Sequence, residues 1–257
     1  MPSRMSRREY LARSAAGVAT GLILSSPLAE AATGAKIKAI AFDGFTVFDP
    51  RTVFALAEQL FPGKGGHLST AWRTRQFEYA WLRTLSGQYV DFWHVTDDAL
   101  VFAAKLLSLE LTPGKRRRLM QAYLEINAWP DVPSSLKLLK EAGLRLVLLS
   151  NFTAAMLDAA VRNSGLESIF EPHLSTDRID AYKPDPRAYR MAVDAFGLRR
   201  DEIAFAAFGG WDAFGAKSFG YPTFWVNRMN LPVEELGTAA DAVGSSLHDL
   251  VRFVRSR

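Results

Sequence analysis

Short apolar runs and helix-spaced apolar positions alternate along much of this chain. Four runs of strand length predict buried strands, at residues 37–42, 144–149, 203–208 and 223–226. Apolar residues at helical spacing, bounded by glycine or proline, predict helices between these runs, at residues 134–142, 152–164 and 186–196. Such alternation predicts an α/β fold, in which helices cover both faces of a Rossmann-like parallel sheet.

A second pattern separates the first predicted strand from the others. Helical spacing of apolar and aromatic residues predicts four successive helices, at residues 52–61, 68–86, 91–108 and 113–127. Pro62–Gly66 predicts a plain turn, because it lacks the Lys-Ser/Thr pair and the preceding strand of a phosphate-binding loop. We therefore expect an α/β core domain at residues 36–51 and 131–257, with an inserted helical cap domain at residues 52–130.

Residues 1–31 have the pattern of an export signal. The Arg7-Arg8 pair precedes an apolar run at residues 15–24, and Ala29-Glu30-Ala31 supplies the small residues of a cleavage site. The apolar run is too short to span a bilayer, and the arginine pair resembles a twin-arginine signal. We expect cleavage after Ala31, the twin-arginine translocase as a partner during export, and a periplasmic location. An amphipathic N-terminus without a targeting role is the alternative.

Composition narrows the chemistry that the remaining chain can perform. The 257 residues include no cysteine, which excludes thiolate nucleophiles, disulfides and cysteine-ligated metals. The four histidines show neither metal-ligand spacing nor the pattern of a Ser-His-Asp triad. A net charge of +4, part of which lies in residues 1–31, gives no support for a nucleic-acid partner. We expect a small-molecule substrate and neither a metal nor a cofactor.

Polar residues follow the predicted strands, where an open α/β sheet binds its ligands. They are Asp43, Ser150-Asn151, Lys183 and Asp212. Each has a structural alternative when taken alone, such as a helix cap, a turn or a solvated lysine. Because parallel strands end at one edge of the sheet, we expect these residues to meet there. Asp43, which ends an apolar run and precedes a glycine, is then the candidate nucleophile.

Six motifs together resemble the haloacid dehalogenase superfamily, and within it the L-2-haloacid dehalogenases, over residues 36–250. The motifs are Phe42-Asp43, the Trp72–Arg83 tract, Leu149–Asn151, Tyr182–Asp185 with Tyr189, Trp211–Ala213 and Gly220–Thr223. The resemblance implies an α/β core with an inserted cap. It also implies hydrolysis of (S)-2-haloacids to (R)-2-hydroxyacids through an ester on Asp43. The substrate would be a 2-haloacid or a related carboxylate, and a homodimer is compatible with the resemblance.

The resemblance also assigns roles to individual residues. It implies that Asp43 is the nucleophile, that Lys183 orients its carboxylate, and that Arg73 with Asn151 receives the departing halide. Ser150 would hold the substrate carboxylate. The residues that would support the lysine, the hydrolytic water and the turn after the nucleophile are Tyr189, Asp212 and Thr46. The aromatic residues expected around the substrate are Phe45, Phe77, Phe92 and Trp211.

The chain departs from the family pattern in two places. The turn after Asp43 is one residue shorter than in the better-known members. Ala207 and Gly209 stand where those members carry a serine and an asparagine. These smaller residues predict room for a bulkier or differently polar substrate. Alternatively, a cap side chain near Thr74 or Phe92 fills the space.

Three other functions compete with dehalogenation. A ring-opening hydrolase of a small cyclic amino acid, such as azetidine-2-carboxylate, would use the same framework. A phosphatase needs Mg²⁺ and usually a second aspartate two residues after the nucleophile, where this chain has Phe45. Gly209-Gly210 also replaces the Gly-Asp pair that such an enzyme carries after the fourth strand. A non-catalytic periplasmic binding protein is the third, since polar groups are lost at positions 207 and 209.

Overall fold

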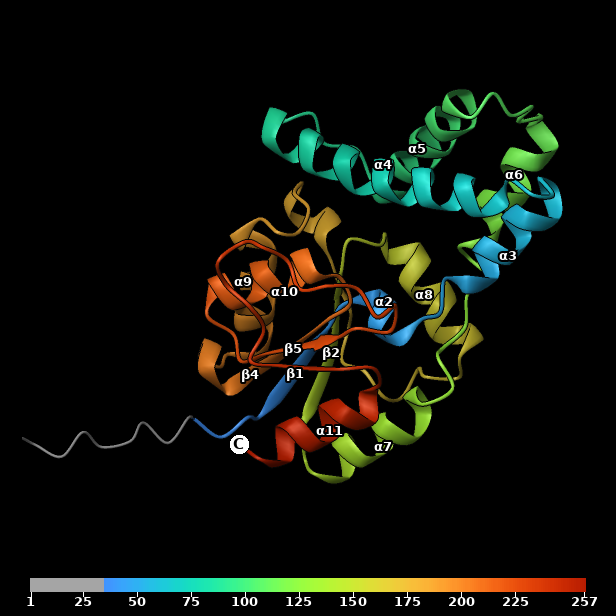
Figure 1. Cartoon of the computed structure of the whole chain (residues 1–257). Coiled ribbons are helices and arrows are strands. Elements are labelled where there is room, and N and C mark those ends of the chain that lie inside the picture. Colours follow the sequence, from blue (N-terminus) through green and yellow to red (C-terminus); the bar gives the residue numbers. More distant parts are fainter. Residues whose placement is uncertain (1–34) are drawn as a thin grey trace, which may run out of the picture. The chain divides into compact units, whose positions relative to one another are not determined.

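A six-stranded, all-parallel sheet forms the centre of the fold (Figure 1). The computed structural model describes residues 35–257, so the predicted export signal lies outside the described residues. The strand order is β3-β2-β1-β4-β5-β6. The strands are β1 (Ala39–Phe42), β2 (Arg145–Ser150), β3 (Leu174–Ser175), β4 (Ile203–Ala207), β5 (Thr223–Val226) and β6 (Ala242–Gly244). This arrangement confirms the predicted α/β class.

Helices occupy most of the chain between the strands. They are α2 (Gly44–Val47), α3 (Arg51–Leu60), α4 (Gly65–Ser86), α5 (Phe92–Leu106), α6 (Pro113–Ala122), α7 (Val132–Glu141), α8 (Ala154–Asn163), α9 (Pro186–Phe196), α10 (Gly210–Phe219) and α11 (Leu247–Arg255), with short 3₁₀ turns η1 (Thr176–Ile179) and η2 (Arg200–Glu202). No helix among residues 35–257 is long and apolar enough to cross a membrane.

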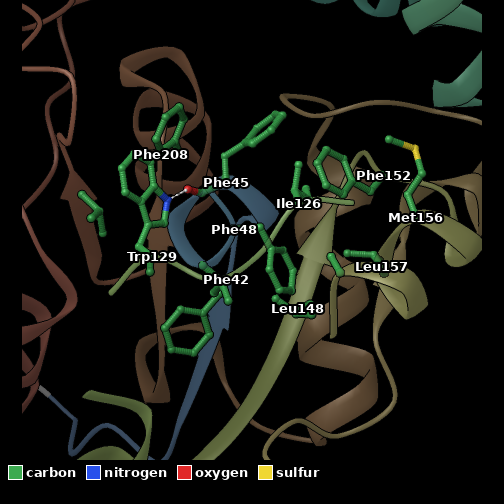
Figure 2. Close-up of a cluster of buried hydrophobic side chains, with 14 of the residues drawn as sticks. Phe42, Phe45, Phe48, Ile126, Trp129, Leu148, Phe152, Met156, Leu157 and Phe208 are labelled. Atoms are coloured by element: carbon green, nitrogen blue, oxygen red, sulfur yellow. Dashed lines mark hydrogen bonds between the residues drawn. The ribbon is translucent and has the colours of Figure 1, made fainter. Parts of the chain in front are cut away.

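Side chains of the central strands alternate between two cores, one on each face of the sheet. In β1, Ile40 and Phe42 belong to one hydrophobic cluster, whereas Ala39 and Ala41 belong to the other. The larger cluster continues past the end of β1 through aromatic residues such as Phe48, as Figure 2 shows. Because all four β1 residues are buried, this strand fixes the depth at which the following Asp43 lies.

Of the six helices that lie between β1 and β2 in sequence, four, α3 to α6, pack against one another (Figure 1). We call them the inserted helices. The described residues 35–257 belong to one compact unit. The division into a core and a cap at residues 52 and 130 therefore stays a prediction.

Two predicted boundaries differ from the structure by three residues or more. Helix α4 begins at Gly65, inside the predicted turn. At this position α3 passes so close that a Cβ on residue 65 would lie 2.2 Å from the Glu58 Cα. Only glycine allows the two helices to approach in this way. Helix α6 ends at Ala122 rather than at residue 127, and residues 123–125 form a turn and a bend.

Candidate active site

Asp43 stands at the carboxyl end of the central strand β1, where it also caps the short helix α2. One carboxylate oxygen, Oδ2, accepts a hydrogen bond of 2.9 Å from the Phe45 backbone N–H. The other, Oδ1, accepts one of 2.6 Å from the Lys183 ammonium. The residue is only 8% exposed. Both oxygens are therefore held in place, and little water surrounds them.

Lys183 lies between two carboxylates in the interior. Its Nζ donates to Asp43 at 2.6 Å and to Asp212 at 2.7 Å, and its side chain is fully buried. Burial alone would lower the pKa of Lys183, but the two carboxylates outweigh burial and raise it. The ammonium therefore stays charged and can hold the Asp43 carboxylate.

Asp212 is a buried acid whose two carboxylate oxygens both accept hydrogen bonds. It accepts 2.7 Å hydrogen bonds from Lys183 and from the Tyr189 hydroxyl. Burial is the main cause that raises the pKa of Asp212 to about 6, with a further rise from the Asp43 charge and an opposing effect from Lys183. Burial also raises the pKa of Tyr189 well above its usual value, so this hydroxyl remains a donor. The site thus contains an acid that changes charge near neutral pH.

Two donors across the site have no acceptor among residues 35–257. Arg73, on α4, forms no salt bridge in this part of the chain, and desolvation lowers the pKa of its guanidinium. The guanidinium carbon lies 5.4 Å from the ring centre of Phe54. The Asn151 amide oxygen accepts from the Lys183 backbone N–H at 3.0 Å, while its buried Nδ2 has no partner in the described chain. The side chains therefore offer a cation and an N–H donor to an anion.

A narrow cavity of about 30 Å³ joins these groups. That volume holds only about two water molecules. Its walls are Asp43, Phe45, Arg73, Phe77, Phe92, Ser150, Asn151, Phe152, Phe208, Gly209, Trp211 and Asp212. Six aromatic side chains among them make the site largely apolar, which strengthens the electrostatic interactions inside it.

Three predicted site residues lie behind the cavity wall. Lys183 and Tyr189 support the carboxylates from within the protein, and the Thr46 hydroxyl donates to the Asp43 backbone oxygen at 2.6 Å. The nine other candidates line the cavity. The family resemblance alone predicts five of them, whereas position after a strand end also predicts the other four, Asp43, Ser150, Asn151 and Asp212. Phe152 and Phe208 were missed, because only polar residues were considered at the strand ends, although both lie within two residues of the ends of β2 and β4. The individual roles of these residues stay predictions.

The expected extra room beside Gly209 is absent. A Cβ built on Gly209 would lie 2.7 Å from the Trp211 indole nitrogen, so the indole already occupies that space. Trp211 in turn packs against Phe77 and Trp81 of α4, with ring centres 5.1 and 5.4 Å away. The prediction of an enlarged pocket is therefore wrong. The filling side chain comes from α10, and not from the region of Thr74 or Phe92.

The fold and this geometry define an α/β enzyme whose active site centres on a buried carboxylate, Asp43, hydrogen-bonded to Lys183. The sequence profile of the haloacid dehalogenase-like hydrolases matches residues 19–220. The chain is 43% identical over 218 residues to the (S)-2-haloacid dehalogenase of Pseudomonas sp. (strain YL), covering 84% of this chain and 94% of that protein. The chain belongs to the haloacid dehalogenase-like hydrolase family.

Two further relatives agree with this assignment. Haloacetate dehalogenase H-2 of Moraxella sp. (strain B) is 42% identical, with 85% of this chain and 98% of that protein aligned. The solved L-2-haloacid dehalogenase of Xanthobacter autotrophicus, with chloropropionic acid covalently bound, superposes with a TM-score of 0.79. It is 33% identical to this chain, and the match covers 85% of this chain and 98% of that one.

Proposed function

We propose that this protein hydrolyses (S)-2-haloacids to (R)-2-hydroxyacids through an ester on Asp43. The strongest support is the position of the Asp43 carboxylate, which Lys183 and the Phe45 N–H hold at the wall of an apolar cavity. Arg73 lines the same cavity and forms no salt bridge in the described chain. A poorly hydrated, fixed carboxylate is a better nucleophile than one in water. Several relatives, including that of Pseudomonas sp. (strain YL), carry the name (S)-2-haloacid dehalogenase.

In the first step, an Asp43 oxygen attacks C2 of the substrate from the side opposite the halogen. The new C–O bond forms as the carbon–halogen bond breaks, and the halide leaves with the bonding electron pair. Arg73 and the Asn151 Nδ2 receive this anion, because neither has an acceptor in the described chain. The Ser150 hydroxyl accepts from the Phe152 N–H at 3.2 Å and keeps its own proton to donate to the substrate carboxylate.

In the second step, water attacks the Asp43 Cγ of the ester. The hydroxy acid departs with an oxygen from Asp43, and the carboxylate is restored with one oxygen from water. Asp212 lines the same cavity, and its pKa of about 6 suits it to accept the water proton. C2 is inverted once, in the first step only, so an S substrate gives an R product.

The test is halide release by the purified protein from each enantiomer of 2-chloropropionate, with the product resolved by chiral chromatography. We expect chloride and (R)-lactate from the S enantiomer and no release from the R enantiomer. Release from neither enantiomer, together with ring opening of azetidine-2-carboxylate, would replace this function by the alternative hydrolase.

We also propose that residues 1–31 export the folded enzyme to the periplasm through the twin-arginine translocase. The Arg7-Arg8 pair supports this, because a receptor that recognises guanidinium geometry does not accept lysine. Changing both arginines to lysine keeps the charge and should leave the precursor in the cytoplasm. Full export of that variant, blocked by inhibiting the general secretory route, would refute the assignment. The homodimer stays a prediction, which light scattering on the purified protein tests.

A further inference from the structure

The turn that carries Asp43 has backbone carbonyls that its own helix cannot satisfy. Helix α2 has only four residues, and the last carbonyls of any α-helix lack partners within it. Three successive carbonyls of α2 instead accept hydrogen bonds from two distant residues. Trp129 Nε1 donates to Phe45 O at 3.0 Å, Arg228 Nη2 donates to Thr46 O at 2.9 Å, and the Trp129 backbone N–H donates to Val47 O at 3.0 Å. Figure 2 shows the Trp129 indole directed at Phe45.

These donors are themselves firmly held. Arg228 forms two hydrogen bonds to Asp131, of 2.9 and 3.1 Å, and its side chain is only 5% exposed. Asp131 also accepts from the Leu247 N–H at 2.7 Å. Burial would raise the pKa of Asp131, but these hydrogen bonds outweigh burial and lower it, so the pair stays charged. The Arg228 guanidinium carbon lies 4.6 Å from the Trp129 ring centre.

The same place joins the inserted helices to the sheet. The Asp49 N–H donates to Asn127 O at 2.8 Å, and Phe48 pairs with Ala128 in an antiparallel bridge. The two chain segments that lead into and out of the inserted helices therefore meet beside α2. Trp129, the residue after Ala128, therefore connects this junction to the carbonyls of α2.

We propose that Trp129, Asp131 and Arg228 form a positioning clamp for the nucleophile. The clamp fixes α2 so that the Phe45 N–H stays aligned with Asp43 Oδ2. None of the three residues lines the cavity, so they act through the turn and not on the substrate. The proposal rests on the proposed role of Asp43. A misplacement of a reacting group by about 1 Å can cost roughly 100-fold in rate.

The decisive variant is Arg228→Met, which removes the donor to Thr46 O and leaves Asp131 without its cation. We expect kcat for (S)-2-chloropropionate to fall by about 10–100-fold while KM changes by less than about threefold, since substrate contacts remain. Arg228→Lys, with one ammonium for two partners, should recover part of kcat. The matched control is Arg145→Met, because Arg145 also binds an acid in two bonds, to Glu171, and donates to a backbone carbonyl, Phe196 O.

A second measurement reports on the turn without requiring activity. Hydrogen exchange of the Phe45 amide, followed by mass spectrometry, should accelerate in Arg228→Met and in Trp129→Phe but not in Arg145→Met. Trp129→Phe removes the indole N–H donor but keeps a buried ring, so it replaces Arg228→Met as the test variant if Arg228→Met does not fold. The clamp is refuted if kcat and Phe45 exchange stay within twofold of wild type in a folded variant. It is also refuted if kcat in Arg228→Met and Arg145→Met falls alike. If wild type releases no halide, the exchange result still decides on the clamp while the proposed function fails.

Discussion

Replacing Arg73 by methionine tests how the site receives the leaving group. The change removes a guanidinium that lines the cavity and forms no salt bridge among residues 35–257, while keeping a long apolar side chain on α4. Because desolvation already lowers the pKa of this arginine, the protein does not gain stability from its charge. We therefore expect the melting temperature to stay the same or rise, while activity falls.

The magnitude follows from the charge that develops on the halide. Two unit charges about 4 Å apart attract by about 4 kcal/mol at an effective dielectric constant of about 20. If the halide carries about half a charge in the transition state, removing the guanidinium would cost about 2 kcal/mol of electrostatic stabilisation. Loss of the N–H donor would cost about 1 kcal/mol more. A total of about 3 kcal/mol corresponds to a rate loss of roughly 100-fold. Bromide leaves more easily than chloride, so the rate for the 2-bromo substrate should fall less than the rate for the 2-chloro substrate.

The assay is rapid-quench measurement of halide release in a single turnover, with (S)-2-chloropropionate and (S)-2-bromopropionate. Arg75→Met is the matched control, because Arg75 lies on the same helix but forms a salt bridge of 3.0 Å to Glu78 and does not line the cavity. Equal losses for Arg73→Met and Arg75→Met, or an equal loss for chloride and bromide, would show that Arg73 does not stabilise the departing halide.

Three other perturbations follow from the same geometry. Asp212 should carry its charge above about pH 6 and lose it below, so kcat should fall as the pH drops from 7 to 5; a flat profile would contradict its role. Gly209→Asn should lower both kcat and the melting temperature by displacing Trp211, and adding Trp211→Ala should restore part of each; a harmless single variant would contradict the close contact. Dialysis against EDTA should leave activity unchanged. Loss of activity after dialysis, restored only by added Mg²⁺, would favour a phosphatase.

The sequence carried enough information for the parallel sheet and for the carboxylate–lysine cluster. The strands β1, β2, β4 and β5 are apolar runs of four to six residues, which periodicity detects, and Asp43 and Asp212 follow two of them closely. By contrast, β3 and β6 have two and three residues, too few for a pattern. Parallel topology then brings the strand ends together without any knowledge of the packing.

Features that depend on packing between distant segments could not be predicted. Gly65 looks like a turn residue until α3 is seen to pass beside it. Trp211 fills the space beside Gly209 because of its side-chain orientation, which no sequence pattern specifies. The clamp joins Thr46 to Arg228 across 182 positions. Such contacts form only when the fold is complete, so local sequence propensities cannot predict them.

The most direct test of the central claim is a single turnover in ¹⁸O-labelled water, with enzyme in excess over (S)-2-chloropropionate. If Asp43 attacks C2 and water attacks the ester, the first lactate carries unlabelled oxygen at C2. The peptide containing Asp43 then gains one ¹⁸O atom, which mass spectrometry locates. Label in the first lactate, with none in the Asp43 peptide, would mean that water attacks C2 directly and would contradict covalent catalysis by Asp43.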